Sequence, residues 1–163
     1  MLGNEEDARF IRDWYLNAVN EKGDRWNLTP PEGWARLGGG CYRAAFLHEE
    51  SGVVYKVQHS YGYGYGQSNA SEAETLRRYM FRKLPQGCRF PRYSFYELDG
   101  KGVMAMERFS KLLRDYSRYA EGSHYWDRLR KLQGALYDVY DLHSANLAID
   151  EENQLLVPID LGG

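Results

Sequence analysis

The sequence predicts an α+β domain, in which an antiparallel sheet with an inserted helix precedes a smaller helical part that ends in a hairpin. Two observations predict this class. Extended runs are interrupted by helical periodicity only at residues 69–84, and the other helical patterns lie at residues 5–20 and after residue 109. The chain has 163 residues and shows no tandem repeat or linker, so we expect a single domain over residues 1–163.

Four segments are expected to be helical, because apolar residues recur in them at three- and four-residue steps. In the first segment, Ala8, Ile11 and Tyr15 form one apolar stripe. The second begins near Ser68 or Asn69, either of which can cap a helix, and it ends before Pro85. The expected ranges are residues 5–20, 69–84, 110–119 and 123–140.

Turn signals between extended runs predict three hairpins. The first turns at residues 49–52, and a glycine triplet at residues 38–40 interrupts its first strand. An Asp-Gly pair marks the turn of the second, and an acidic turn marks the third. Residues 59–68 alternate Tyr and Gly after a histidine, which indicates a loop. The hairpins are expected within residues 34–58, 90–108 and 146–160.

Composition excludes several classes of function. The 23 acidic residues outnumber the 21 basic ones, which argues against a nucleic-acid partner. No apolar stretch approaches the roughly 18 residues of a membrane span, so no membrane partner is expected. The N-terminus is acidic and lacks the apolar core of a secretory signal. Two cysteines, Cys41 and Cys88, make no disulfide framework, so a reducing cytoplasm is the expected compartment.

The glycine triplet can be explained in two ways. Glycine lets backbone N–H groups turn tightly and approach a phosphate closely. Taken alone, however, three glycines in an extended run favour a β-bulge or a sharp strand turn. Both interpretations stay open at this point.

Lys56 and Glu72 are charged residues in apolar surroundings. Lys56 shares a face with Val54 in a β-branched strand, opposite Val53, Tyr55 and Val57, so it points either to solvent or to a buried acid. Glu72 shares the apolar face of its helix with Leu76 and Tyr79, and an acid on a buried face needs a cation. Lys56 is a candidate for that cation. The alternative is that the helix dipole alone stabilises Glu72.

Three oxygen-bearing side chains near the end of the chain suggest metal and proton chemistry. Asp141, Asn146 and Asp160 flank the two strands of the last hairpin. A carboxylate with a carboxamide suits Mg²⁺, and a further carboxylate can accept a hydroxyl proton. The alternative is turn chemistry, because Asp and Asn commonly close loops.

Taken in order, these features resemble the protein-kinase-like superfamily. The run Asp-Leu-His-Ser-Ala-Asn at residues 141–146 is most similar to aminoglycoside and choline phosphotransferases. The resemblance extends from residue 34 to the end of the chain. It implies a kinase-like N-lobe at residues 34–109 after an N-terminal helix and loop at 1–33. It also implies a reduced C-lobe at 110–163 that carries the catalytic-loop hairpin.

The resemblance also implies roles for individual residues, with ATP and Mg²⁺ as cofactors. Lys56 would hold the nucleotide phosphates while paired to Glu72. Asp141 would be the catalytic base, and His143 occupies the position of the basic residue that follows it. Arg43 stands where a third glycine is often found. The remaining roles are phosphate contact by Gly38, Gly39 and Gly40, adenine contact by Glu107 and Phe109, and Mg²⁺ coordination by Asn146 and Asp160.

The sequence departs from the family pattern in two respects. Val139 replaces the histidine that normally braces the catalytic loop, and the pattern stops at Gly163 without an activation segment. In this the chain is similar to small kinase-like proteins of phage and bacteria. We expect the helices at residues 5–20 and 123–140 to brace the loop instead, with a homodimer as a further source of support.

Three functions remain open from the sequence. The first is an active phosphotransferase that acts on a hydroxyl acceptor, which would be a small molecule, a protein or the chain itself. The second is a nucleotide-binding pseudokinase that acts as a protein-interaction or inhibitor module. The third is a structural protein, in which Lys56 and Glu72 form a buried salt bridge of little net stabilising value.

Overall fold

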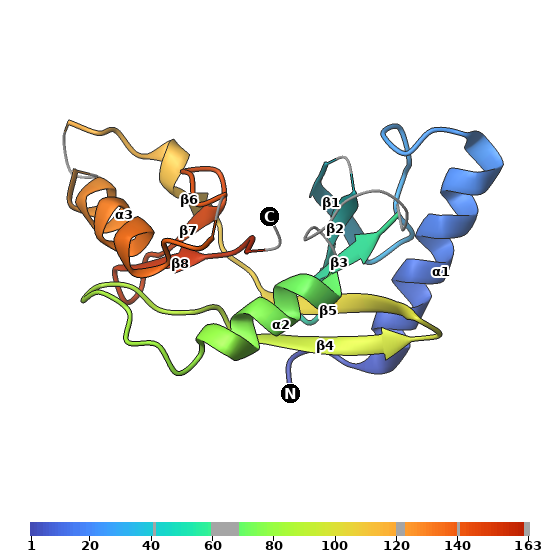
Figure 1. Cartoon of the computed structure of the whole chain (residues 1–163). Helices are drawn as coiled ribbons and strands as arrows, with labels where there is room; N and C mark the ends of the chain where they lie inside the picture. The colour runs from blue at the N-terminus through green and yellow to red at the C-terminus, as the bar shows by residue number, and fades with distance from the viewer. Residues whose placement is uncertain (41, 60–68, 120–122, 140, 162–163) are drawn as a thin grey trace. The chain divides into compact units, whose positions relative to one another are not determined.

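The computed structural model describes residues 1–40, 42–59, 69–119, 123–139 and 141–161 (Figure 1). Contacts divide the chain into two units, which are described separately. The sheet unit comprises Met1–Ala73 and Arg92–Arg108, and the hairpin unit comprises Glu74–Pro91 and Phe109–Gly163. One boundary therefore falls inside a helix, between Ala73 and Glu74, and another falls between Arg108 and Phe109.

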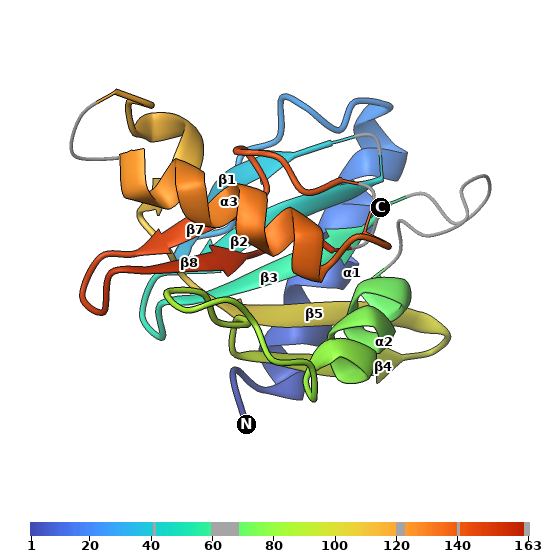
Figure 2. The ribbon, with the colours of Figure 1, turned by 60° about the vertical axis from the view of Figure 1, so that its left-hand side comes forward.

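The sheet unit contains a five-stranded antiparallel sheet with the order β1-β2-β3-β5-β4 (Figure 2). Helix α2 (Asn69–Tyr79) is inserted in sequence between β3 and β4. The predicted α+β class is confirmed, and so are the turns of the first two hairpins, but the first predicted strand is divided into β1 and β2 at the glycine triplet. The strands are β1 (Trp34–Gly39), β2 (Arg43–His48), β3 (Val53–Gln58), β4 (Tyr93–Leu98) and β5 (Lys101–Glu107).

One face of this sheet packs against α1 (Glu5–Lys22). The side chains of Ile11 and Tyr15 on the helix and Tyr55 on β3 are completely buried there. Alternation then directs Lys56 to the opposite face of β3. Asn4 caps the helix by accepting a hydrogen bond from the Asp7 amide. Burial of the apolar stripe thus decides which face of the sheet remains for charged side chains.

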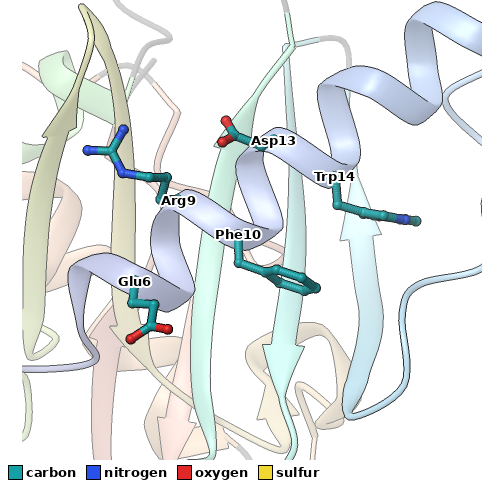
Figure 3. A pocket seen from close by; sticks show the side chains of 5 residues that line it. All are labelled: Glu6, Arg9, Phe10, Asp13 and Trp14. Atoms are coloured by element: carbon teal, nitrogen blue, oxygen red, sulfur yellow. The ribbon is translucent and has the colours of Figure 1, made fainter.

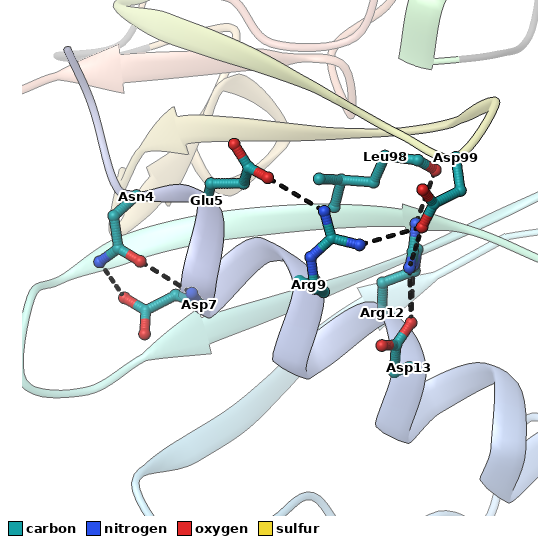
Figure 4. A network of polar contacts seen from close by, with 8 residues as sticks. All are labelled: Asn4, Glu5, Asp7, Arg9, Arg12, Asp13, Leu98 and Asp99. Atoms are coloured by element: carbon teal, nitrogen blue, oxygen red, sulfur yellow. Dashed lines mark hydrogen bonds and ion pairs between the residues drawn. The ribbon is translucent and has the colours of Figure 1, made fainter.

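Two arginines fix α1 to the turn between β4 and β5 (Figure 4). Arg12 is buried, and its Nη1 donates to the Leu98 carbonyl at 2.6 Å. The more exposed Arg9 donates to Asp99 at 2.9 Å and to Glu5 at 3.0 Å. The hydrogen bond from Arg9 holds the pKa of Asp99 below its usual range. Helix position is therefore set by specific polar contacts as well as by apolar burial.

The hairpin unit contains a three-stranded antiparallel sheet in the order β6-β7-β8. Leu147 pairs with Pro158 and Asp150 pairs with Leu155, which confirms the predicted last hairpin. Helix α3 packs against β8. The elements are β6 (Lys111–Leu112), the 3-10 helix η1 (Leu113–Asp115), α3 (Ser123–Ala135), β7 (Leu147–Asp150) and β8 (Leu155–Pro158).

The helices differ from the sequence-based expectation. The helix expected at residues 110–119 is wrong: Lys111 and Leu112 form β6 by pairing with Ile149 and Ala148, and only a short 3-10 helix follows. A long-range strand pairing has therefore overridden local periodicity. Helices α2 and α3 end earlier than expected, at Tyr79 and Ala135. No helix in the described ranges is long and apolar enough to cross a membrane.

We expect Arg12→Met to destabilise the protein by about 1–3 kcal/mol, because the buried Leu98 carbonyl would lose its donor. Urea unfolding followed by tryptophan fluorescence measures this change. Arg9→Met is the matched control, since Arg9 reaches the same turn from an exposed position and should shift the unfolding midpoint little. Equal midpoints for the two variants would contradict the role given to Arg12.

Candidate functional site

The sheet unit brings Lys56 and Glu72 together. Lys56 Nζ lies 3.0 Å from Glu72 Oε1 and 3.1 Å from Oε2. Lys56 projects from the middle of β3, and Glu72 lies in the first turn of α2. The Glu72 side chain is completely buried, whereas 12% of the Lys56 side chain is exposed. A buried carboxylate requires a cation, and Lys56 supplies one.

Arg43 also binds Glu72, which the sequence analysis did not predict. Its Nη1 donates to Glu72 Oε2 and, at 3.3 Å, to Asn69 Oδ1. The strand register could have revealed this contact. Arg43 pairs with Gln58, two positions along β3 from Lys56, so Arg43 and Lys56 point to the same face of the sheet. Glu72 thus accepts hydrogen bonds from two cationic side chains.

The buried carboxamide of Asn69 fixes the start of α2 to the sheet. Its Nδ2 donates to the Lys56 carbonyl at 2.7 Å and to the Gly102 carbonyl at 2.9 Å. These acceptors lie on neighbouring strands, β3 and β5. Because α2 starts at Asn69, this anchor holds Glu72 over β3. Ser68, the other expected cap, lies outside the described residues.

The glycine triplet lies at the turn between β1 and β2. The strand register shifts between Arg36 and Gly38, so a β-bulge is present. A Cβ on Gly39 would lie 2.8 Å from Arg36 Nη2 and 3.3 Å from the Arg43 carbonyl oxygen, but one on Gly38 or Gly40 would meet no atom within 4 Å. None of the three has a left-handed backbone. Packing thus explains glycine at position 39 only.

The residues expected to contact adenine belong to different units. Glu107 ends β5 in the sheet unit, where its carboxylate accepts from the Arg92 amide at 2.7 Å and from Arg92 Nε at 3.2 Å. Phe109 belongs to the hairpin unit, where the Arg89 guanidinium lies 5.5 Å from its ring centroid. The chain passes from one unit to the other between Arg108 and Phe109.

The hairpin unit brings Asp141, His143 and Asn146 together in one loop. Asn146 Nδ2 donates to Asp141 Oδ2 at 3.1 Å and to the Asp141 carbonyl at 3.0 Å. His143 Nε2 lies 3.2 Å from Asp141 Oδ1, and both side chains are about half exposed. The Ala145 amide donates to His143 Nδ1, so the neutral ring carries its proton on Nε2, toward Asp141. Tyr140, which precedes this loop, lies outside the described residues.

The last hairpin brings Asp160 to the same end as Asn146. The Ile159 amide donates to the Asn146 carbonyl at 3.0 Å, one step beyond the pairing of Leu147 with Pro158. Asp160 follows directly and is half-buried. Antiparallel pairing of β7 with β8 therefore places Asn146 and Asp160 at the same end of the hairpin. Gly162 and Gly163, which follow, lie outside the described residues.

Two hydrogen bonds brace the loop. Gln133 Nε2 on α3 donates to the Leu142 carbonyl at 2.8 Å, and the Arg114 amide in η1 donates to the Ser144 carbonyl at 3.2 Å. Of the two helices expected to brace the loop, α3 does so, whereas α1 packs against β3, β4 and β5. The loop backbone is thus held by contacts from α3 and η1.

A third brace precedes the loop and was not predicted. The Arg82 guanidinium lies 4.0 Å from the centroid of the buried Tyr79 ring and donates to both carboxylate oxygens of Asp138, at 3.1 and 3.2 Å. A hydrogen bond from Tyr79, assisted by Arg82, holds the pKa of Asp138 below its usual range. The end of α2 is thus tied to the segment that leads into Asp141.

A surface pocket of about 440 Å³ lies elsewhere in the sheet unit, on the outer side of α1 (Figure 3). Figure 3 shows Phe10 and Trp14 flanked by charged side chains along one helix. None of the predicted site residues lines it. Its full lining is Glu6, Arg9, Phe10, Asp13 and Trp14.

Comparison with known proteins gives a likeness of fold. No protein-family model matches the chain, and no curated protein sequence matches it. Among solved structures, the chain is similar to the PknI kinase domain of Mycobacterium tuberculosis, with 16% sequence identity and a TM-score of 0.46. The match covers 82% of this chain and 61% of that domain, so the chain spans less than two thirds of its length.

We expect Glu72→Gln to destabilise the protein by about 3–5 kcal/mol, because it leaves two cationic side chains beside a neutral amide in a buried place. Chemical denaturation gives the free energy of unfolding directly. The matched control is Glu74→Gln, an exposed carboxylate on the same helix that should change stability little. If Glu72→Gln lowers the free energy of unfolding no more than the control does, Glu72 is not the shared counter-charge.

Proposed function

We propose that this protein is an ATP- and Mg²⁺-dependent phosphotransferase that transfers the γ-phosphate to a hydroxyl acceptor. The observation that carries the proposal is the buried contact between Lys56 on β3 and Glu72 on α2. A buried ion pair adds little net stability compared with apolar residues of similar volume. A cation held rigidly in place is instead what phosphoryl transfer requires, because its catalysis rests on positioning and charge neutralisation.

The glycine-rich turn supports nucleotide binding. Neither packing nor backbone conformation requires glycine at positions 38 and 40. Close approach of a ligand phosphate to the backbone is a physical reason that remains. In this proposal Gly38, Gly39 and Gly40 lie along the phosphates, Lys56 binds them, and residues 107–109 meet the adenine.

Asn146 and Asp160 have the donor chemistry that Mg²⁺ prefers. Nδ2 of Asn146 donates to Asp141, so Oδ1 is the atom that would serve a cation. Within the described ranges, no three His, Cys, Asp or Glu side chains gather as a metal site. Mg²⁺ would therefore take these two side chains together with water and phosphate oxygens, as is common for this ion. When bound, it would neutralise charge on the phosphates.

Asp141 is the proposed base for the acceptor hydroxyl. Its carboxylate is about half exposed, which leaves it accessible to an acceptor. A hydrogen bond from Asn146 and the nearby His143 ring, whose Nε2 lies 3.2 Å from Asp141 Oδ1, restrict its orientation, so that it need not reorganise when it accepts the proton. His143 acts here as a positioning residue.

We expect ATP with Mg²⁺ to raise the melting temperature of the wild type. At a hundred times its dissociation constant, a ligand adds about 2.7 kcal/mol of stability, which is readily measured. Asp160→Ala should lose the Mg²⁺-dependent part of the rise, and Asp127→Asn, an exposed carboxylate on α3, should keep it. No rise at millimolar ATP in the wild type would contradict the nucleotide site.

We expect Asp141→Asn to abolish transfer of γ-labelled phosphate while ATP binding persists, because the amide cannot accept the hydroxyl proton. Candidate acceptors are small hydroxyl compounds, proteins and the chain itself, and intact mass spectrometry reports the product. Transfer that survives in Asp141→Asn would refute the assigned base. Nucleotide binding without transfer to any acceptor would favour the alternative function, a pseudokinase that acts as an interaction or inhibitor module.

A further inference from the structure

Two cationic side chains share one buried carboxylate in the sheet unit. Lys56 contacts both carboxylate oxygens of Glu72, at 3.0 and 3.1 Å. Arg43 adds a second cation to Oε2, although one cation is enough to balance one carboxylate. Within this group of three side chains, two are positively charged and one is negatively charged.

Anchoring of α2 does not account for Arg43. Asn69 already ties the start of the helix to two strands, through the carbonyls of Lys56 and Gly102. Lys56 ties the helix to the sheet a second time through Glu72. A third anchor adds little rigidity, whereas a second buried cation carries a large desolvation cost. The position therefore calls for a reason beyond holding the helix.

Arg43 lies at the glycine-rich turn. Its carbonyl accepts a hydrogen bond from the Gly40 amide at 2.8 Å, and 12% of its side chain is exposed. It therefore joins the turn to the Lys56–Glu72 pair. A guanidinium carries five N–H donors in a planar fork that matches phosphate oxygens, while an ammonium acts as a point charge. Arg43 can thus keep Glu72 and bind a phosphate oxygen with the same fork.

We propose that Arg43 and Lys56 together form a polyphosphate-binding site in which Glu72 is the shared counter-charge. This inference rests on the proposed function and assigns its phosphate recognition to a residue at the position where the family often has glycine. The site takes the phosphate chain of a nucleoside triphosphate, and two cations favour a ligand with several negative charges. Affinity is then expected to rise from adenosine to ADP to ATP.

Isothermal titration calorimetry with ATP, adenosine and inorganic tripolyphosphate tests this site. Arg43→Gln should weaken ATP and tripolyphosphate binding about 10- to 100-fold, the loss typical of one or two charged hydrogen bonds, and leave adenosine unaffected. A merely structural role would weaken all three ligands alike. The matched control is Arg77→Gln, an exposed arginine on α2 that should bind each ligand as the wild type does.

The outcomes separate this inference from the proposed function. If the wild type binds ATP and Arg43→Gln binds ATP and tripolyphosphate within twofold of it, the role of Arg43 is refuted and the nucleotide site stands. If tripolyphosphate binds in an Arg43-dependent way but ATP binds no more tightly than tripolyphosphate, the phosphate site stands and the proposed function fails. A wild type that binds neither ligand refutes both.

A second variant keeps the test decisive if Arg43→Gln does not fold. Arg43→Lys retains the charge but not the planar fork, so circular dichroism should show a folded protein. Its affinity for tripolyphosphate should fall about 3- to 10-fold with adenosine binding unchanged, because a point charge replaces a planar fork that contacts Glu72 and a phosphate oxygen together. Equal tripolyphosphate affinity in Arg43→Lys and the wild type would overturn the role of the fork.

Discussion

The burial of one carboxylate organises the sheet unit. Glu72 is completely enclosed, and an enclosed charge is tolerated only with cations and hydrogen bonds around it. Lys56 and Arg43 supply the cations from neighbouring strands, and Asn69 fixes the helix that carries Glu72. The packing of α1 on the opposite face leaves this side of the sheet for polar groups. Core packing and site geometry are thus two consequences of one strand alternation.

In the hairpin unit, the main structural requirement is to hold a short loop of polar residues in place. Asn146 donates to the Asp141 carboxylate and to the His143 carbonyl, the His143 ring lies beside Asp141, and Gln133 fixes the loop backbone to α3. The pair between Arg82 and Asp138 holds the approach to the loop. These contacts come from residues of the hairpin unit itself, so the loop is held in place within that unit. Each unit therefore carries its own part of the proposed chemistry.

Strands and hairpins were easier to predict than helix limits. Turns such as Asp99–Gly100, with φ of 52° and 76°, have strong local signals, and alternation fixes which face each strand residue occupies. The helix expected at residues 110–119 failed because Lys111 and Leu112 pair with β7, which is distant in the sequence. Competition between a local pattern and a distant partner cannot be judged from the local pattern.

Backbone periodicity in the sequence was enough to predict that Lys56 shares a strand face with Val54 and that Glu72 lies on the apolar side of its helix. Which cations meet Glu72 depended on how the strands and α2 pack together, and the structure adds Arg43 to the expected Lys56. The tertiary structure likewise showed that Gln133 on α3, and not α1, braces the loop at residues 141–146. Periodicity defines the face of an element, whereas the distance between two faces depends on strand register and packing, which involve the whole chain.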